Sequence, residues 1–246
     1  MKDNLPGQAS DAQIPTLALG LAKRFPHLLN APFLQDLTDA TKHSFLDQCT
    51  LQSHQTAHVI LSQGDRAPGM FIIAQGAVEV TCQNPDGQSI LVHIARRGEI
   101  LGDVETLADG PCSATCIALP GTVTLLCPGQ VLREQVKSDP FLRNIAKVFS
   151  ERLDRDNTSK FIDQFYPVER RLCAYLYRLS VDSSEITKTQ SELAGFLGCA
   201  RQTLNRELGR LRDAGVITSA KGKITIADRD ALLSRAAGEV ALPAKP

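Results

Sequence analysis

The hydrophobic pattern of this chain changes its period near Pro140, so one kind of secondary structure cannot account for the whole sequence. Between residues 58 and 127, short runs rich in Val, Ile and Thr alternate with turn signals such as Pro68-Gly69 and Pro120-Gly121. From Phe141 onward, apolar residues recur at steps of three and four, as on one face of a helix. The sequence therefore predicts an α+β fold, with a β-rich half followed by a helical half.

The β-rich half has the strand spacing of a compact antiparallel barrel or sandwich. Asn84-Pro85-Asp86-Gly87 separates two strand-like runs and predicts a hairpin loop. Residues 17–50, before the strands, have helix-like apolar spacing that Pro26 and Pro32 interrupt.

A long helix is expected from Pro140 to just before Pro167. Its apolar residues form one stripe, made of Phe141, Ile145, Val148, Phe149, Leu153, Phe161, Ile162 and Phe165. A small barrel does not cover a helix of about 25 residues, so we expect the stripe to pair with a second copy of the chain. The alternative is that the helix lies across its own domain.

The segment after Pro167 has the pattern of a helix–turn–helix followed by a β-wing. Thr189 and Glu192 fit a capping box that opens one helix, and Gly198-Cys199-Ala200 forms the turn to the next. Leucines 204, 208 and 211 are expected to bury the second helix, and residues 216–226 predict a two-stranded wing that turns at Lys221-Gly222.

The exposed face of the second helix would then carry polar side chains suited to DNA. Arg can bind guanine through two hydrogen bonds, and Gln or Asn can bind adenine in the same way. From 167 to 235 the chain has 12 Lys and Arg against 8 Asp and Glu, whereas the rest has 15 against 19. A basic module on an acidic body is typical of a polyanion-binding protein.

Taken together, these motifs resemble the CRP/FNR superfamily of bacterial transcription regulators over roughly residues 20–230. The resemblance implies a β-roll of the cyclic-nucleotide-binding, jelly-roll type, a long dimerisation helix and a C-terminal winged helix–turn–helix. The expected domains are a tail (1–16), a sensor domain (17–139), the dimerisation helix (140–166), the DNA-binding domain (167–235) and a second tail (236–246).

The stretch "LGCARQTLNREL" is similar to the family's Gly-Cys-Ser-Arg-Glu-Thr-Val-x-Arg pattern. The resemblance implies base contacts by Arg201, Gln202 and Arg206, with Asn205 in the variable slot. The further DNA contacts expected are phosphate contacts by Thr203, Gln190 and Ser191, and contacts by the wing residues Lys221 and Lys223. The family usually has Glu where this chain has Gln202, so the preferred base pair is expected to differ there.

In the sensor half, "GEILGDVETLADGPCSAT" is similar to the family's phosphate-binding cassette. The candidate effector pocket comprises Gly102, Asp103, Cys112 and Ser113 from the cassette, with Asp156 and Asn157 from the long helix. Cys112 stands where cyclic-nucleotide binders have the arginine that pairs with the phosphate. Without that cation a buried phosphate is poorly compensated, so we do not expect cAMP to bind.

Seven cysteines without any C-x-x-C pair are expected to be reduced thiols. Core packing is the expected role, but Cys82, Cys112, Cys116 and Cys127 are also candidates for a redox site, an Fe–S cluster or another metal site. Cys112 and Cys116 have the same parity on one predicted strand and are therefore expected to share a face. Haem ligation by a histidine is a further alternative.

No Walker loop, G-x-S-x-G, H-E-x-x-H or G-x-G-x-x-G motif occurs, so an enzyme with a catalytic site is not expected. No apolar run is long enough for a membrane span and no signal peptide is recognisable, which predicts a cytoplasmic protein. The predicted function is a homodimeric regulator, activator or repressor, that binds a near-palindromic site on double-stranded DNA. A small-molecule or redox signal would control it unless it is constitutively active. The resemblance implies RNA polymerase as a partner. The alternative function is a regulatory or interaction protein with a cyclic-nucleotide domain and no DNA binding.

Overall fold

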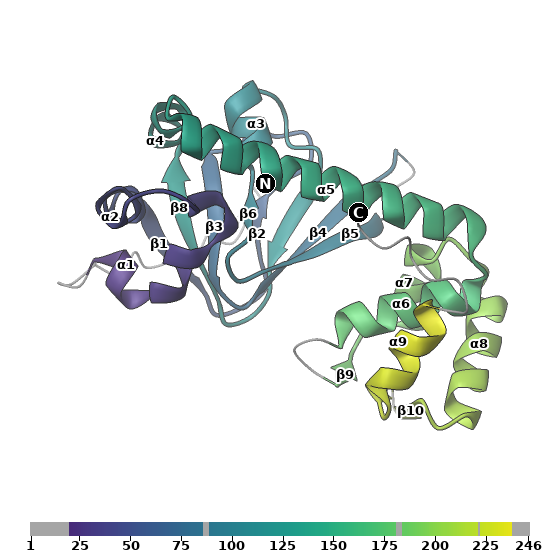
Figure 1. Cartoon of the computed structure of the whole chain (residues 1–246). Coiled ribbons are helices and arrows are strands. Elements are labelled where there is room, and N and C mark those ends of the chain that lie inside the picture. Colours follow the sequence, from purple (N-terminus) through teal and green to yellow (C-terminus); the bar gives the residue numbers. More distant parts are fainter. Residues whose placement is uncertain (1–19, 86–88, 181–183, 221, 238–246) are drawn as a thin grey trace, which may run out of the picture.

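The computed structural model describes residues 20–85, 89–180, 184–220 and 222–237, without the side chains of Ser159, Ile162, Asp163 and Ala237. The predicted 1–16 tail, residues 86–88 of the predicted hairpin loop, Lys221 and most of the 236–246 tail lie outside these ranges. The fold consists of an N-terminal β-roll with a helical lead, a long helix that crosses it, and a small C-terminal domain beyond that helix (Figure 1). The predicted α+β class is confirmed.

Two four-stranded antiparallel sheets form the roll. In order across each sheet, the first contains β1 (Thr50–His54), β8 (Thr122–Pro128), β3 (Gly69–Gln75) and β6 (Ile100–Leu101). The second contains β2 (His58–Leu61), β7 (Thr115–Ala118), β4 (Ala77–Gln83) and β5 (Ser89–Arg96). Gln83 at the end of β4 is paired with Ser89 at the start of β5, which confirms the hairpin expected around Asn84.

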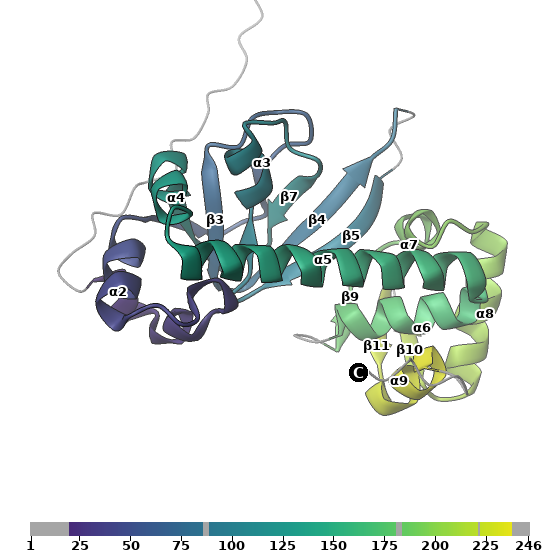
Figure 2. The ribbon, with the colours of Figure 1, turned by 45° about the horizontal axis from the view of Figure 1, so that its top comes forward.

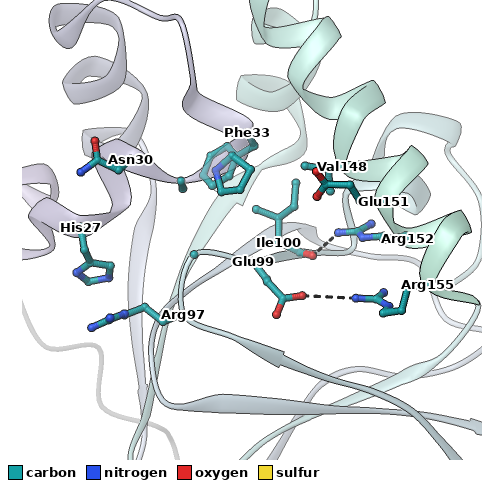
Figure 3. Close-up of a pocket in the computed structure, with 13 residues that line it drawn as sticks. His27, Asn30, Phe33, Arg97, Glu99, Ile100, Val148, Glu151, Arg152 and Arg155 are labelled. Carbon is teal, nitrogen blue, oxygen red and sulfur yellow. Dashed lines mark hydrogen bonds and ion pairs between the residues drawn. The ribbon is translucent and has the colours of Figure 1, made fainter. Parts of the chain in front are cut away.

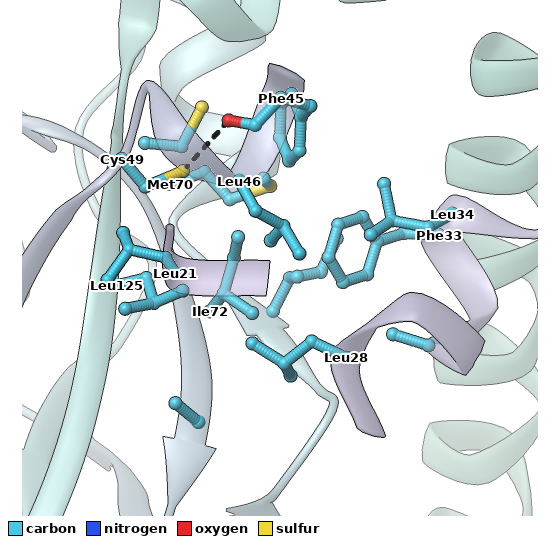
Figure 4. Close-up of a cluster of buried hydrophobic side chains, with 14 of the residues drawn as sticks. Leu21, Leu28, Phe33, Leu34, Phe45, Leu46, Cys49, Met70, Ile72 and Leu125 are labelled. Carbon is cyan, nitrogen blue, oxygen red and sulfur yellow. Dashed lines mark hydrogen bonds between the residues drawn. The ribbon is translucent and has the colours of Figure 1, made fainter. Parts of the chain in front are cut away.

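Strand β3 is buried on both faces and so joins two cores. Phe71 and Ile73 face the space between the sheets. Met70 and Ile72 face the helical lead, made of α1 (Leu21–Arg24), η1 (Pro26–Asn30), η2 (Pro32–Leu34) and α2 (Asp39–Asp47) (Figure 4). Each fully buried side chain of this size contributes about 1.5–3 kcal/mol to folding, so the lead is held firmly on the roll.

The long helix α5 (Asp139–Phe165) corrects the expectation of a single uniform stripe. Phe141 and Ile145 are fully buried against their own sensor domain. By contrast, Leu153, Phe161 and Phe165 are 63%, 52% and 63% exposed. Phe141 and Ile145 in the first part of the helix therefore pack within the chain, whereas the described apolar side chains of its second part form an uncovered face.

The C-terminal domain follows α5 directly (Figure 2). Its elements are α6 (Val168–Leu179), β9 (Glu185–Ile186), α7 (Gln190–Phe196), α8 (Arg201–Asp213), β10 (Ile217–Ala220), β11 (Lys223–Ile226) and α9 (Arg229–Ala237). The remaining helices of the sensor are α3 (Asp103–Ala108) and α4 (Gly129–Gln135). The wing hairpin β10–β11 is present as predicted, and β9 adds a third strand to it.

Candidate nucleic-acid interface and sensor region

The capping box predicted at the start of α7 is confirmed. The Thr189 hydroxyl accepts a hydrogen bond from the Glu192 backbone N–H at 3.2 Å, and the Thr189 N–H donates to the Glu192 carboxylate at 2.7 Å. These bonds lower the pKa of Glu192, because they stabilise its charged form. Gln190 and Ser191 lie exposed in the first turn that this cap fixes.

Gly198 forms the turn between the two helices with a φ of +56°, a conformation that glycine adopts at little cost. The helix α8 then begins at Arg201. Its leucines 204, 208 and 211 are buried, as predicted. They pack in the domain core with Leu193 and Leu197 of the preceding helix segment.

The opposite face of α8 brings together most of the predicted base-reading residues. Arg201, Gln202, Asn205 and Arg206 are exposed, and their spacing of one and four residues puts them on adjoining positions of the first two turns. Thr203 is partly buried beside them. In a helix–turn–helix, the N-terminal end of the second helix is the part that approaches the bases of a major groove. These side chains lie at that end of α8.

Glu207 is a member of this region that sequence reasoning missed. It is 3% exposed, and its carboxylate accepts hydrogen bonds from Arg206 at 3.1 Å and Arg210 at 2.9 Å. A buried carboxylate requires such charged donors, and Glu207 holds the guanidinium groups of both arginines. Arg201 makes no such ion pair within the described residues.

The wing carries one described lysine of the two that were predicted. Lys223 lies at the start of β11 and forms an ion pair with Glu185 at 3.0 Å, with both side chains 54% exposed. Lys221 lies outside the described residues. The wing is therefore linked to the β9 strand through a solvent-exposed pair of low strength.

The C-terminal domain contacts the sensor roll along β4 and β5. Lys188, just before α7, forms an ion pair with Glu79 on β4 at 2.9 Å, with the side chains 23% and 12% exposed. The Arg96 guanidinium donates to the Arg178 carbonyl at 3.0 Å. Ser191 lines the hollow of about 1000 Å³ that remains between α7 and these strands.

In the sensor, the predicted pocket residue Asp103 is already paired within the chain. It is 0% exposed, and Arg152 of α5 donates to both of its carboxylate oxygens at 3.0 Å. Arg152 also donates to the Ile100 carbonyl. Burial raises the pKa of Asp103, and Arg152 opposes that rise only in part.

Gly102, next to Asp103, has a φ of +73°, and a Cβ at this position would lie 3.0 Å from the Gly69 carbonyl oxygen. Both the conformation and the close approach require glycine here. The Gly102 carbonyl accepts a hydrogen bond from the Thr106 hydroxyl at 2.5 Å. The local chain is therefore fixed around the buried carboxylate.

The other end of the cassette is occupied by a carboxylate of the protein itself. The Ser113 N–H and hydroxyl donate to the same Glu105 oxygen at 3.3 and 2.8 Å. Cys112 is buried beside them, and Asp156 lies close enough to raise the pKa of Cys82, after the larger effect of burial. Asn157 is instead exposed on α5, four residues from both Leu153 and Phe161.

The four cysteine candidates do not form one cluster. Cys112 precedes β7 rather than lying on the same strand as Cys116, although both are buried in the core between the sheets. Cys127 belongs to the separate core under the helical lead, where it contacts Cys49. Within the described ranges, no three His, Cys, Asp or Glu side chains are arranged to hold a metal ion.

Burial also favours the protonated form of the Cys112 and Cys116 thiols. It raises the pKa of Cys116 to about 12 and is the largest effect on Cys112 as well. A hydrogen bond with Cys127, burial and nearby charges raise the pKa of Cys49. Thiolate is the reactive form, so these side chains have the chemistry of core residues.

A β-roll joined by a long helix to a winged helix–turn–helix defines a class of protein in which a sensor domain is fused to a DNA-binding domain. Residues 51–139 match the family described as cyclic nucleotide-binding domain. Residues 170–235 match the family described as Crp-like helix-turn-helix domain.

Among curated proteins, the chain is similar to the cAMP-activated global transcriptional regulator CRP of Salmonella typhimurium. The two are 24% identical over 199 residues, which cover 77% of this chain and 94% of the relative. The CRP-like cAMP-activated global transcriptional regulator of Mycobacterium tuberculosis is 23% identical over 189 residues, which cover 73% of this chain and 84% of that relative.

The fold is similar to a candidate regulator of the CRP/FNR family from Eubacterium rectale, with a TM-score of 0.71, 18% identity and coverage of 84% of this chain and 98% of that one. For a CRP/FNR-family regulator of Thermus thermophilus, the TM-score is 0.65 and the identity 20%, with coverage of 77% of this chain and 100% of that one. The chain belongs to the CRP/FNR superfamily of transcription regulators. The helix–turn–helix match disfavours the alternative of a regulatory protein without a DNA-binding domain. None of the described helices has the length and apolarity to cross a membrane.

Proposed function

We propose that the protein binds a near-palindromic DNA site as a homodimer, with the α8 helix of each copy in a major groove. The observation that carries this proposal is the outward face of α8, where Arg201, Gln202, Asn205 and Arg206 are exposed over a leucine core. Arg201 and Arg206 would bind guanine, and Gln202 would read a base pair different from the one that Glu selects. Gln190 and Ser191 would contact phosphates at the start of α7.

The dimer would form through the second half of α5. Leu153, Phe161 and Phe165 are more than half exposed there, and Asn157 lies on the same face. An apolar stripe that begins where the helix leaves its own domain is the expected seam for a second copy of the same helix. Two-fold symmetry would then give the two α8 helices the spacing of a palindromic site.

The signal is proposed to differ from cAMP. Cys112 offers no cation to a phosphate, and the Ser113 donors already bind the Glu105 carboxylate. Asp103, at the position implied for ribose binding, is held by Arg152. A different small molecule or constitutive activity is consistent with these contacts, whereas the burial and the raised pKa of Cys112 and Cys116 argue against redox control by these two thiols. RNA polymerase would be the partner at regulated promoters.

The reading face is tested with a DNA site selected from a randomised library and a fluorescence anisotropy titration. Arg201→Ala is expected to weaken binding by about 1–3 kcal/mol, the value of a bidentate base contact, and to relax sequence preference at one position of each half-site. Arg143→Ala, on exposed α5 and paired with Asp139, is the matched control. Equal affinities for the two variants would show that Arg201 does not read bases.

The dimer is tested by light scattering on purified protein. Phe161→Asp is expected to produce monomers, because it puts a charge in the apolar seam. Leu233→Asp changes a residue of similar exposure, 46%, on the distant helix α9 and should leave the dimer intact. A dimer that persists in Phe161→Asp would contradict the proposed seam.

A further inference from the structure

A cavity outside the predicted effector pocket lies between the helical lead, the β5–β6 turn and α5 (Figure 3). Its volume of about 370 Å³ is that of a small-molecule site. The buried floor is formed by Phe33 and Ile100, each 1% exposed, and Val148 of α5 continues it. This apolar floor favours a ligand with a hydrocarbon portion.

The polar side chains around the floor differ in whether they already have partners within the chain. Arg152 is bound to Asp103, and Arg155 lies 3.8 Å from Glu99 and 3.0 Å from His93. The charges of these two arginines are therefore paired with carboxylates of the chain and contribute little net attraction for a ligand, although the buried Nε of Arg155 makes no hydrogen bond within the described residues.

The opposite wall carries groups that the described residues leave without a partner. Arg97 is exposed and forms no ion pair within them, and the buried Nε2 atom of His27 makes no hydrogen bond there. Figure 3 shows both side chains on the same side of the cavity. An unpartnered cation beside an unsatisfied ring nitrogen is suited to an anionic group.

Glu151 limits the charge of the ligand. It lies on the α5 side of the cavity and forms no ion pair among the described residues. A second anionic group near it would be repelled, whereas an apolar chain on Phe33, Ile100 and Val148 would not. The arrangement therefore fits one negative charge at one end of an apolar body.

We propose that this cavity binds a small organic anion, a carboxylate or a phosphate monoester with an apolar chain, whose charged end lies against Arg97 and His27. The ligand would contact both the helical lead and α5. Arg152 lies in the cavity wall and is bound to Asp103 of the cassette. A ligand that displaced Arg152 would therefore also change the contacts of the cassette. An effect on DNA binding rests on the proposed function, but the binding site itself does not.

Isothermal titration calorimetry on the full chain tests the site with octanoate, hexyl phosphate and octylamine as probes. Octanoate or hexyl phosphate should bind, and their relative affinities distinguish the two anion types, while octylamine should bind at least tenfold more weakly. Arg97→Gln should weaken anion binding at least fivefold, and Val148→Trp should abolish it by filling the cavity. Arg66→Gln, an exposed arginine paired with Asp109 elsewhere on the roll, should have no effect.

Absence of anion binding, equal binding of octylamine, or unchanged affinity in Arg97→Gln would overturn the proposal. A DNA titration with and without octanoate is read separately. Anion binding that leaves DNA affinity unchanged would remove the regulatory role and keep the site. A protein that binds octanoate but no DNA would instead contradict the proposed function.

Discussion

The two ends of this molecule use their polar side chains in opposite ways. In the C-terminal domain, Arg201, Gln202 and Asn205 point outward from a leucine core and are free to meet another molecule. In the sensor, Asp103 and Ser113 are bound by Arg152 and Glu105 of the same chain. By the proposed function, helix α8 would present an outward face to DNA, whereas residues of the predicted effector pocket are bound by other residues of the same chain.

The largest expected effect comes from breaking the internal contact of the sensor. Arg152→Met should lower the free energy of unfolding by about 3–5 kcal/mol, because it leaves the fully buried Asp103 carboxylate without its cation. Urea denaturation measures this loss. Arg143→Met removes an exposed pair on the same helix and should change stability by less than about 1 kcal/mol.

The same variant has a predicted pH dependence. The pKa of Asp103 is raised in the folded state, so its contribution to stability is greatest below the unfolded pKa and is lost as pH rises through the folded pKa. Without Arg152 the folded pKa rises further. The destabilisation by Arg152→Met should therefore be largest near pH 7 and should shrink toward about pH 4. A pH-independent loss would contradict the buried ion pair.

A smaller effect is expected from the one buried carboxylate of the recognition helix. Glu207→Gln should cost about 1.5 kcal/mol of stability, at the lower end for hydrogen bonds to charged groups, because Arg206 and Arg210 are largely exposed. DNA affinity should also fall, since Arg206 loses its anchor. Glu185→Gln, which breaks an exposed pair, is the control for both measurements. Identical behaviour of the two variants would mean that Glu207 does not position Arg206.

The start of α7 offers a still smaller and local test. Thr189→Ala removes the cap and should cost about 1 kcal/mol, while Thr189→Ser should retain most of it. Hydrogen exchange of the Glu192 amide should rise in the alanine variant alone. Unchanged exchange would show that the cap does not stabilise this helix in solution.

Modification or oxidation of the cysteines is expected to have the smallest effect on both the sensor domain and the C-terminal domain. Cys82 and Cys199 are partly exposed and should react first with a thiol reagent, while the other five thiols are buried and should react only on unfolding. DNA affinity should change by less than about twofold after treatment with diamide. A larger change that a reductant reverses would restore the redox interpretation.

The structure of the C-terminal domain was predicted well because the sequence signals that define it are local. The capping box, the glycine turn and the leucine spacing all act within a few residues, and each is found where it was expected. Glu207 escaped notice because periodicity does not distinguish a buried carboxylate from a solvated one. Arg206, one position before it, and Arg210, three positions after it, were the available signal.

The sensor half was predicted in outline only. That position 112 is a cysteine and not an arginine could be read directly, but the Asp103–Arg152 pair joins residues 49 positions apart. The division of the α5 stripe also depends on tertiary contacts, since Phe141 and Phe161 have the same chemistry and opposite environments. Such pairings follow from packing, which a single sequence does not display.

The DNA-binding half is proposed to function without a cyclic nucleotide in the sensor half. The most direct test is a fluorescence anisotropy titration of the intact protein on a selected DNA site, with and without cAMP. The cAMP concentration is 1 mM, which is about the Kd of a weakly bound ligand. We expect sequence-specific binding whose Kd agrees within about twofold in the two titrations. Tightening of DNA binding by tenfold or more with cAMP, about 1.4 kcal/mol, would show instead that a cyclic nucleotide activates DNA binding.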